Sequence, residues 1–156
     1  FYLDHNIYKE YEFAGTIYTE KKNSKDFSDP NTVLYGHNML NGTMFQNLHY
    51  FQDPDFFNDN DILYIYTPGH ILTYRIFAAY QYDDSHILNS FDFSDEAVFA
   101  QYLEDCLNPR SMLCNVREDT TLTTDDKIIT LSTCLGSNKS VRYLVQGVLI
   151  KDERTR

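Results

Sequence analysis

The stretch 61–82, DILYIYTPGHILTYRIFAAYQY, decides the fold class of this chain. It contains two runs rich in β-branched and aromatic residues, 61–67 and 71–82, which are separated by Pro68-Gly69 and one further residue. Such residues favour strands, and a Pro-Gly pair marks a turn. The stretch therefore predicts an antiparallel hairpin, and we expect this hairpin to form the centre of a β-sheet.

Other apolar runs predict further strands, and two segments predict helices. The predicted strands outside the hairpin cover residues 12–19, 32–35, 127–134 and 141–150. A short helix is expected over 43–50. In 94–107, SDEAVFAQYLEDCL, apolar residues recur at helical spacing, and Ser94 can cap the first turn. Many short strands with one long inserted helix indicate a mainly β fold, and closure into a barrel would protect the strand edges.

Length and charge limit the classes of function. The 156 residues, 42% of them apolar and 15% aromatic, suffice for a single domain, which we take to span 1–156. The 13 basic and 23 acidic residues give a net charge of −10, which repels phosphate backbones, so no nucleic-acid partner is expected. No apolar run reaches the roughly 18 residues of a membrane-spanning helix. Because the chain starts at Phe1 without a methionine, we expect an upstream targeting or anchoring segment.

Cys134 is the candidate nucleophile. It ends an apolar strand and is followed by a loop that contains Gly136, where its sulfur can meet solvent and substrate. The three cysteines are an odd number, so at least one stays outside any intramolecular disulfide. The plainer interpretation is that Cys134 is a small buried hydrophobic residue, as free cysteines often are.

His37 and Arg142 are the other two candidates. His37 follows Gly36 at the end of a predicted strand, and Arg142 opens the last strand eight residues after Cys134. A tight loop over that separation can bring the guanidinium and the sulfur to the same rim. Taken singly, a histidine in such a place is more often structural, and an arginine there is a solvated edge charge. Only the combination points to a catalytic site.

The motifs around these residues carry a family resemblance. They are Y-G-H-N at 35–38, T-L-S-T-C at 130–134 and V-R-Y-L-V at 141–145, in that order. This pattern resembles the sortases, which carry such motifs on a closed eight-stranded β-barrel. The helix at 94–107 and the phrase YGHNMLNGTMF, leading into a short helix, are typical of class B of that family.

The resemblance implies a cysteine transpeptidase with Cys134, His37 and Arg142 as its catalytic residues. Cys134 would attack the carbonyl after the threonine of a sorting signal in a secreted protein, while His37 supplies a proton to the leaving amine. An amine of a peptidoglycan precursor would then resolve the thioacyl enzyme, with His37 as base, and so anchor the protein to the cell wall. Arg142 would donate to the substrate backbone or to the oxyanion.

By the same resemblance, Tyr35, Ser132 and Thr133 could line the peptide groove. Ser132 is the stronger candidate, because side chains alternate along a strand and Ser132 shares a face with Cys134. The family further implies a monomer on the extracellular face of the cell membrane of a Gram-positive bacterium, anchored by an N-terminal segment outside this sequence.

No cofactor or metal ion is expected. The acidic cluster of Asp53, Asp55, Asp59 and Asp61 superficially resembles a calcium loop, but it lacks the glycine and the terminal glutamate that such loops need. A solvated acidic loop is therefore expected there. The histidines other than His37 show no metal-ligand spacing, and the one beside the predicted short helix, His49, is the open case.

Three rival functions and one possible disulfide remain open. A pilin-polymerising sortase would share the three catalytic residues but use a pilin lysine as acceptor. A non-catalytic β-barrel binding module would merely pack the cysteine and histidine, and a plain cysteine hydrolase would resolve the thioester with water. Cys106 and Cys114 could form a disulfide in an oxidising exterior, although buried free thiols are the favoured state.

Overall fold

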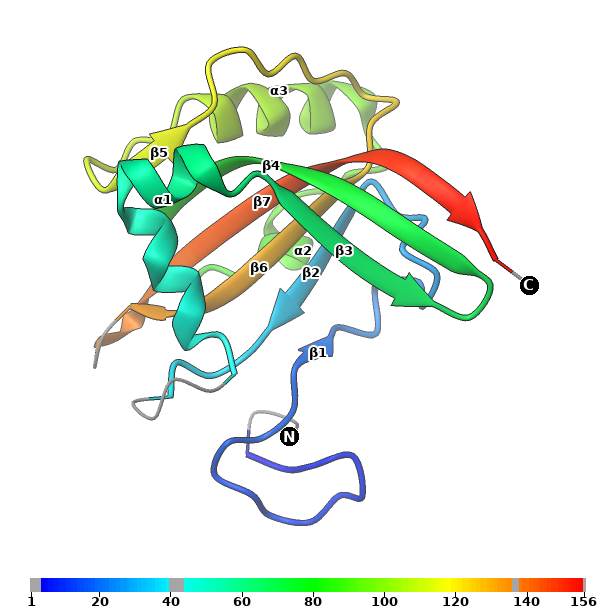
Figure 1. The fold of residues 1–156 in the computed structure, drawn as a ribbon, viewed down its shortest axis with the longest axis vertical. Coiled ribbons are helices and arrows are strands. Elements are labelled where there is room, and N and C mark those ends of the chain that lie inside the picture. Colours follow the sequence, from blue (N-terminus) through cyan, green and yellow to red (C-terminus); the bar gives the residue numbers. More distant parts are fainter. Residues whose placement is uncertain (1–3, 40–43, 136–137, 156) are drawn as a thin grey trace.

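The computed structural model describes residues 4–39, 44–135 and 138–155, which form one mixed β-sheet with helices around it (Figure 1). The hydrogen-bonded order of the strands is β1-β2-β6-β7-β4-β3, and β5 pairs with β4. The strands are β1 Tyr18–Thr19, β2 Asn31–Tyr35, β3 Ile62–Thr67, β4 His70–Asp83, β5 Cys114–Val116, β6 Ile128–Leu135 and β7 Asn138–Arg154. Strand β6 therefore lies between β2, to which it is parallel, and β7, to which it is antiparallel.

The hairpin predicted over 61–82 is confirmed as β3 and β4, which pair antiparallel up to Thr67 opposite His70. This register leaves Pro68 and Gly69 as a two-residue turn. Gly69 has a φ of +85°, in the left-handed region that glycine adopts without strain. The hairpin is not the centre of the sheet, because β3 lies at an edge and β6 and β7 are the middle pair of the strand order.

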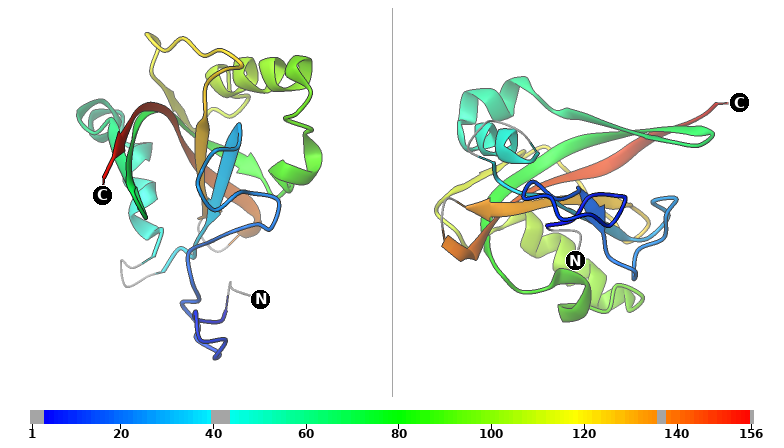
Figure 2. Two further views of the ribbon diagram at one scale, coloured as in Figure 1. Left: turned by 90° about the vertical axis from the view of Figure 1, so that its right-hand side faces the viewer. Right: turned by 90° about the horizontal axis from the view of Figure 1, so that it is seen from below.

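Helices cover both faces of this sheet (Figure 2). They are η1 Gln46–Gln52, a 3-10 helix, and the α-helices α1 Pro54–Asp59, α2 Ile87–Ser90 and α3 Glu96–Leu107. On one face α3 buries Phe99 against a layer that includes Leu144 of β7. On the other face Leu48 of η1 and Phe57 of α1 are buried against a layer that includes Val145 of β7. Side-chain alternation along each strand thus supplies two apolar layers.

The expected closure into an eight-stranded barrel is not confirmed. Within the described residues the sheet has seven strands, and its hydrogen-bonded path ends at β1 and β3 without joining them. Of the strand predicted over 12–19, only two residues pair, since Gly15 has a φ of +60° and Phe13 and Ile17 are exposed. An edge strand of two residues offers too few backbone hydrogen-bonding groups to pair with a further strand. Among the described residues, no helix has the length and apolar character needed to cross a bilayer.

The two predicted helices are present with shifted limits. The segment predicted over 94–107 forms α3, which begins two residues later because the Asp95 carboxylate, instead of Ser94, accepts hydrogen bonds from two N–H groups of the first turn. The helix predicted over 43–50 corresponds to the 3-10 helix η1, and its predicted start at Thr43 lies outside the described residues. The short strand β5 was not predicted.

A buried polar network fixes α3 against the sheet. Gln146 Nε2 donates to the hydroxyl groups of Tyr102 (3.0 Å) and Thr130 (2.9 Å), and the Tyr80 hydroxyl donates to Gln146 Oε1 (2.7 Å). Gln146 is fully buried. Because buried polar groups need partners, this pattern ties β4, β6, β7 and α3 into one arrangement.

Replacing Gln146 with leucine should destabilise the protein, because three buried hydroxyl groups would each lose a partner. We expect the free energy of unfolding, measured by urea denaturation, to fall by about 2–4 kcal/mol. Gln101→Leu is the matched control, since Gln101 is exposed on α3 and bonds to Asp105 at the surface. A similar loss of stability in both variants would contradict the role given to the network.

Candidate active site

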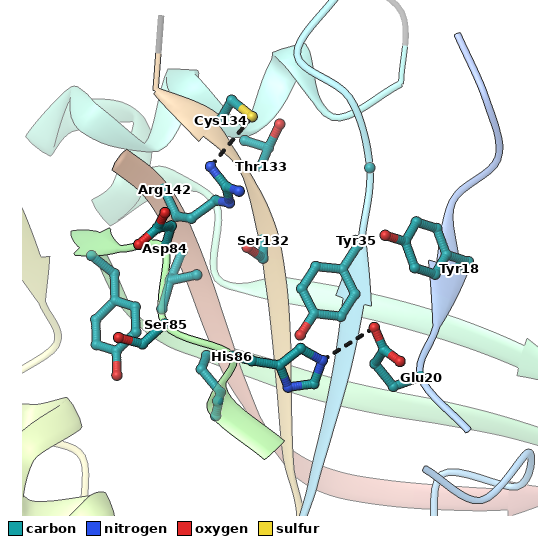
Figure 3. A pocket seen from close by; sticks show the side chains of 14 residues that line it. Tyr18, Glu20, Tyr35, Asp84, Ser85, His86, Ser132, Thr133, Cys134 and Arg142 are labelled. Atoms are coloured by element: carbon teal, nitrogen blue, oxygen red, sulfur yellow. Dashed lines mark hydrogen bonds and ion pairs between the residues drawn. The ribbon is translucent and has the colours of Figure 1, made fainter. Parts of the chain in front are cut away.

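Cys134 and Arg142 face each other across the β6–β7 pair. The antiparallel register places Cys134 directly opposite Arg142, so both side chains leave the same face of the sheet. Arg142 Nη1 lies 3.6 Å from Cys134 Sγ (Figure 3). A guanidinium donor at this distance can stabilise negative charge on the sulfur or on an oxyanion that forms beside it.

Both residues line a hollow of about 210 Å³ beside α2. Tyr35, Ser132 and Thr133 line the same hollow, so five of the six site residues suggested by the sequence surround one space (Figure 3). Tyr35 comes from β2, whereas Ser132 and Thr133 precede the cysteine on β6. The three strands therefore converge on a single cleft at one end of the sheet.

One hydroxyl group in this hollow lacks a partner within the described residues. Tyr35 Oη is buried there without a hydrogen bond. Burial, with a further contribution from the Glu20 carboxylate, raises the pKa of Tyr35 to about 12, so its hydroxyl stays neutral at neutral pH. Buried polar groups without partners cost free energy. A ligand that brings a polar group into the hollow could satisfy the Tyr35 hydroxyl.

The parallel pair of β2 and β6 brings His37 to the same end of the sheet. Tyr35 pairs with Ser132, and the Gly36 N–H donates to the Ser132 carbonyl at 3.2 Å. Continued for two more residues, this register would set His37 level with Cys134. Over the described ranges, however, His37 is not among the residues around the hollow, and no hydrogen bond joins its ring to the Cys134 thiol.

The turn after β2 determines how the His37 side chain is held. Gly36 is required there, because a Cβ at this position would lie 2.8 Å from the Phe45 ring. The Phe45 N–H donates to the His37 carbonyl at 2.8 Å. The His37 ring stacks on Phe13, with centroids 5.9 Å apart and planes inclined by 10°. Contacts with aromatic neighbours, rather than with the thiol, therefore orient this imidazole.

The far end of the hollow holds residues that the sequence did not indicate. His86 Nε2 lies 3.2 Å from a Glu20 carboxylate oxygen, and Asp84 and Tyr18 line the same space (Figure 3). Glu20 follows β1 and His86 precedes α2, so only the fold brings them together. The one sequence signal was a polar run directly after the strand predicted to end at Tyr82.

The acidic cluster over 53–61 has structural partners. The Asp53 carboxylate accepts a hydrogen bond from the Asp55 N–H at 2.9 Å and caps α1. Asp61 lies 3.6 Å from Arg75 Nε in a partly exposed ion pair. In the part of the chain that the structure describes, no three His, Cys, Asp or Glu side chains gather as metal ligands do.

All three cysteines are free, so Cys106 and Cys114 are not paired. Cys106 is buried in the layer under α3, and its sulfur lies 3.7 Å from the Tyr80 hydroxyl oxygen. Burial raises the pKa of the Cys106 thiol to about 11. Cys114 and Cys134 are both partly exposed. Cys106 is therefore less accessible to solvent than Cys134, the cysteine that lines the hollow.

Native protein should react with iodoacetamide at Cys134 well before Cys106. At pH 8 a thiol with a pKa of about 11 holds roughly two hundredfold less thiolate than an ordinary thiol, and burial adds a steric barrier. Timed alkylation followed by peptide mapping measures each site separately. Denatured protein is the control, in which both sites should react at similar rates; equal labelling in the native protein would contradict the burial of Cys106.

Comparison with known proteins agrees with this arrangement. The family model described as the Sortase domain matches residues 6–150. Sortase B of Listeria monocytogenes is 32% identical over 154 residues, which are 96% of this chain and 60% of that protein. The structure of a mutant form of Clostridium perfringens sortase B matches with a TM-score of 0.84 and 33% identity, covering 97% of this chain and 71% of that one. A Staphylococcus aureus sortase B–substrate complex matches with a TM-score of 0.80 and 26% identity, covering 96% and 68%.

The chain belongs to the sortase family. Within that family it is a class B sortase, as the motifs at 35–38 and 130–134 and the helix at 94–107 implied. The expectation of a sortase-type, mainly β fold is thereby confirmed. The chain spans about three fifths of the length of the curated relatives it matches.

Proposed function

We propose that residues 1–156 form the catalytic domain of a cysteine transpeptidase that joins secreted proteins to the cell wall. The observation that carries this proposal is the contact of Arg142 with the Cys134 thiol inside a hollow that also holds the Tyr35 hydroxyl, which has no hydrogen-bond partner within the described residues. Acyl transfer from a peptide needs a thiol nucleophile, a donor for the oxyanion and polar groups that orient the peptide. The hollow offers all three kinds of group.

In the first half-reaction, the Cys134 thiol passes its proton to His37, and the thiolate attacks the threonine carbonyl of a sorting signal. The bond between Sγ and the carbonyl carbon forms, the amide bond after the threonine breaks, and protonated His37 gives its proton to the leaving amine. In the second half-reaction, an acceptor amine attacks the thioester carbonyl and loses a proton to His37, and the carbon–sulfur bond breaks. One amide replaces another, so no oxidant or external energy source is needed.

His37 acts at the nitrogen atoms that leave and enter. A general acid must reach the leaving amine rather than the sulfur. The parallel register of β2 and β6 favours this role, because it carries the His37 backbone to the level of Cys134 while the ring stays outside the hollow. A peptide lying between the two residues would receive the sulfur on one side and the imidazole on the other.

Arg142 donates to the substrate backbone or to the oxyanion of each tetrahedral intermediate. Its position opposite Cys134 on the neighbouring strand supports this role, since the guanidinium already lies 3.6 Å from the sulfur. Tyr35, Ser132 and Thr133 line the groove for the sorting peptide. The buried hydroxyl group of Tyr35, without a partner in the described part of the chain, supports a contact with a polar group of the peptide.

The partners follow from this chemistry. We infer a sorting-signal peptide as substrate, and the S. aureus relative has been solved as a complex with substrate. The acceptor is an amine of a peptidoglycan precursor. The enzyme works as a monomer on the extracellular face of a Gram-positive cell membrane, held by an N-terminal anchor. The net charge of −10 disfavours nucleic acid as a partner.

Incubation with a library of threonine-containing sorting peptides and an amine acceptor should yield peptide joined to the acceptor after the threonine, detected by mass spectrometry. Cys134→Ala should remove all product, because it deletes the nucleophile. Exclusive release of the free acid would indicate a hydrolase, and strict dependence on a pilin lysine would indicate a pilin polymerase. No turnover of any peptide by the folded protein would favour a binding module and would refute transpeptidation.

Arg142→Lys should lower kcat/KM for transpeptidation by at least about a hundredfold, because lysine keeps the charge but not the fork of donors. Arg75→Lys is the matched control, since Arg75 lies on β4 and forms surface ion pairs with Asp61 and Asp119. The rates are measured with one sorting peptide and one acceptor, alongside a melting curve. Near-normal turnover in folded Arg142→Lys would contradict the assigned role.

A further inference from the structure

The carbonyl group of Cys134 is held in an unusual way. On the β7 side, the ladder becomes irregular directly after Cys134. On the β2 side, the last regular bond is from the Gly36 N–H to the Ser132 carbonyl. The next donor in a parallel ladder would be the N–H of Asn38. The chain has left β2 by then, and the Asn38 side chain takes that place, with Nδ2 donating to the Cys134 carbonyl at 3.2 Å.

His49 supplies a second hydrogen bond to the same oxygen. Its Nε2 lies 3.1 Å from the Cys134 carbonyl oxygen, and its Nδ1 lies 2.8 Å from Gln52 Nε2. An amide nitrogen can only donate, so Nδ1 accepts and the ring proton sits on Nε2, directed at the carbonyl. The ring stacks on Tyr143, with centroids 5.4 Å apart. Three contacts therefore fix one tautomer and one orientation of His49.

The neutral form of His49 suits this arrangement. Burial lowers the pKa of His49, partly opposed by the hydrogen bond to the Cys134 carbonyl. A second ring proton would point at the Gln52 amide nitrogen, which has no lone pair to receive it. Near neutral pH the imidazole thus remains a fixed single donor rather than a proton carrier.

His49 acts from the face of the sheet opposite to the hollow. It belongs to η1, and its ring packs on Tyr143, which lies in the apolar layer under η1 and α1. Arg142 and Cys134 alternate with Tyr143 and Thr133 along their strands, so the sulfur leaves the other face. A peptide in the hollow would not touch His49.

We propose that His49, oriented by Gln52, is a positioning residue for Cys134: together with Asn38 it fixes the peptide group that carries the nucleophile where the ladder fails. Two donors on this carbonyl hold the Cys134 backbone in one conformation. They also draw negative charge away from an oxygen close to the sulfur, which favours the thiolate when it forms. The effect on transpeptidation rests on the proposed function, whereas the effect on thiol reactivity does not.

Two substitutions of His49 separate the hydrogen bond from the packing. His49→Leu removes the donor, and His49→Gln retains an N–H donor of comparable reach. His70→Leu is the matched control, because His70 begins β4 and pairs with Asp152 at the exposed surface. The measurements are the rate of iodoacetamide labelling of Cys134 by peptide mapping, kcat and KM for transpeptidation, and the melting temperature.

We expect His49→Leu to slow labelling of Cys134 and to lower kcat by about five- to tenfold each, the effect of one lost hydrogen bond, with KM within about twofold of wild type. His49→Gln should recover most of both rates, and His70→Leu should match wild type. Labelling of folded His49→Leu at the wild-type rate would overturn the proposal. So would equal impairment of His49→Gln and His49→Leu, which would assign the effect to ring packing.

A third variant covers the case in which His49→Leu does not fold. Gln52→Leu keeps the ring and its stacking but removes the donor to Nδ1, so the imidazole loses its fixed tautomer. We expect slower labelling of Cys134 with a smaller loss than for His49→Leu, and wild-type labelling would overturn the proposal. If wild-type protein labels normally but transfers no peptide, the proposed function fails while the comparison of labelling rates still decides the role of His49.

Discussion

The register of β6 against β7 is the constraint on which the site depends. Because side chains alternate along a strand, a slip of one residue would turn Cys134 away from the hollow, toward the layer where Tyr143 packs. The register is secured far from the site by Gln146, whose buried amide bonds to hydroxyl groups of β4, β6 and α3. A buried polar group whose hydrogen bonds can all form in only one arrangement of the strands specifies that arrangement more strictly than an apolar side chain of the same size would.

A second constraint is the parallel pairing of β2 with β6, the one parallel pair among the described strands. Antiparallel neighbours can be joined by a tight turn, as β3 and β4 are, whereas β2 and β6 are joined only through all the elements between them. The pairing brings the end of β2 beside the end of β6, and there Gly36 allows the chain to turn under Phe45. His37 and Asn38 follow at once, so one turn supplies both an imidazole and a donor for the Cys134 carbonyl.

The sequence predicted which residues lie around the hollow better than it predicted the architecture of the sheet. Cys134 and Arg142 could be paired in advance, because both lie at strand ends a short loop apart and strand alternation is a local rule. The open sheet could not be predicted, since closure depends on whether distant edges meet, and the run over 12–19 keeps only two paired residues. Glu20 and His86 were missed for the same reason, as no local pattern reports that β1 lies beside the segment before α2.

The sheet also divides two tasks between its faces. On the α2 face lie the sulfur, Arg142 and the hydroxyl of Tyr35, which line the hollow in which we propose that the peptide binds. From the η1 face, His49 reaches only the backbone of Cys134. Residues behind the sheet can therefore alter how firmly the nucleophile is held without changing the shape or charge of the groove. Under the two proposals made above, affinity for the peptide and reactivity of the thiol are set by different layers of one small domain, and a single strand, β6, connects them.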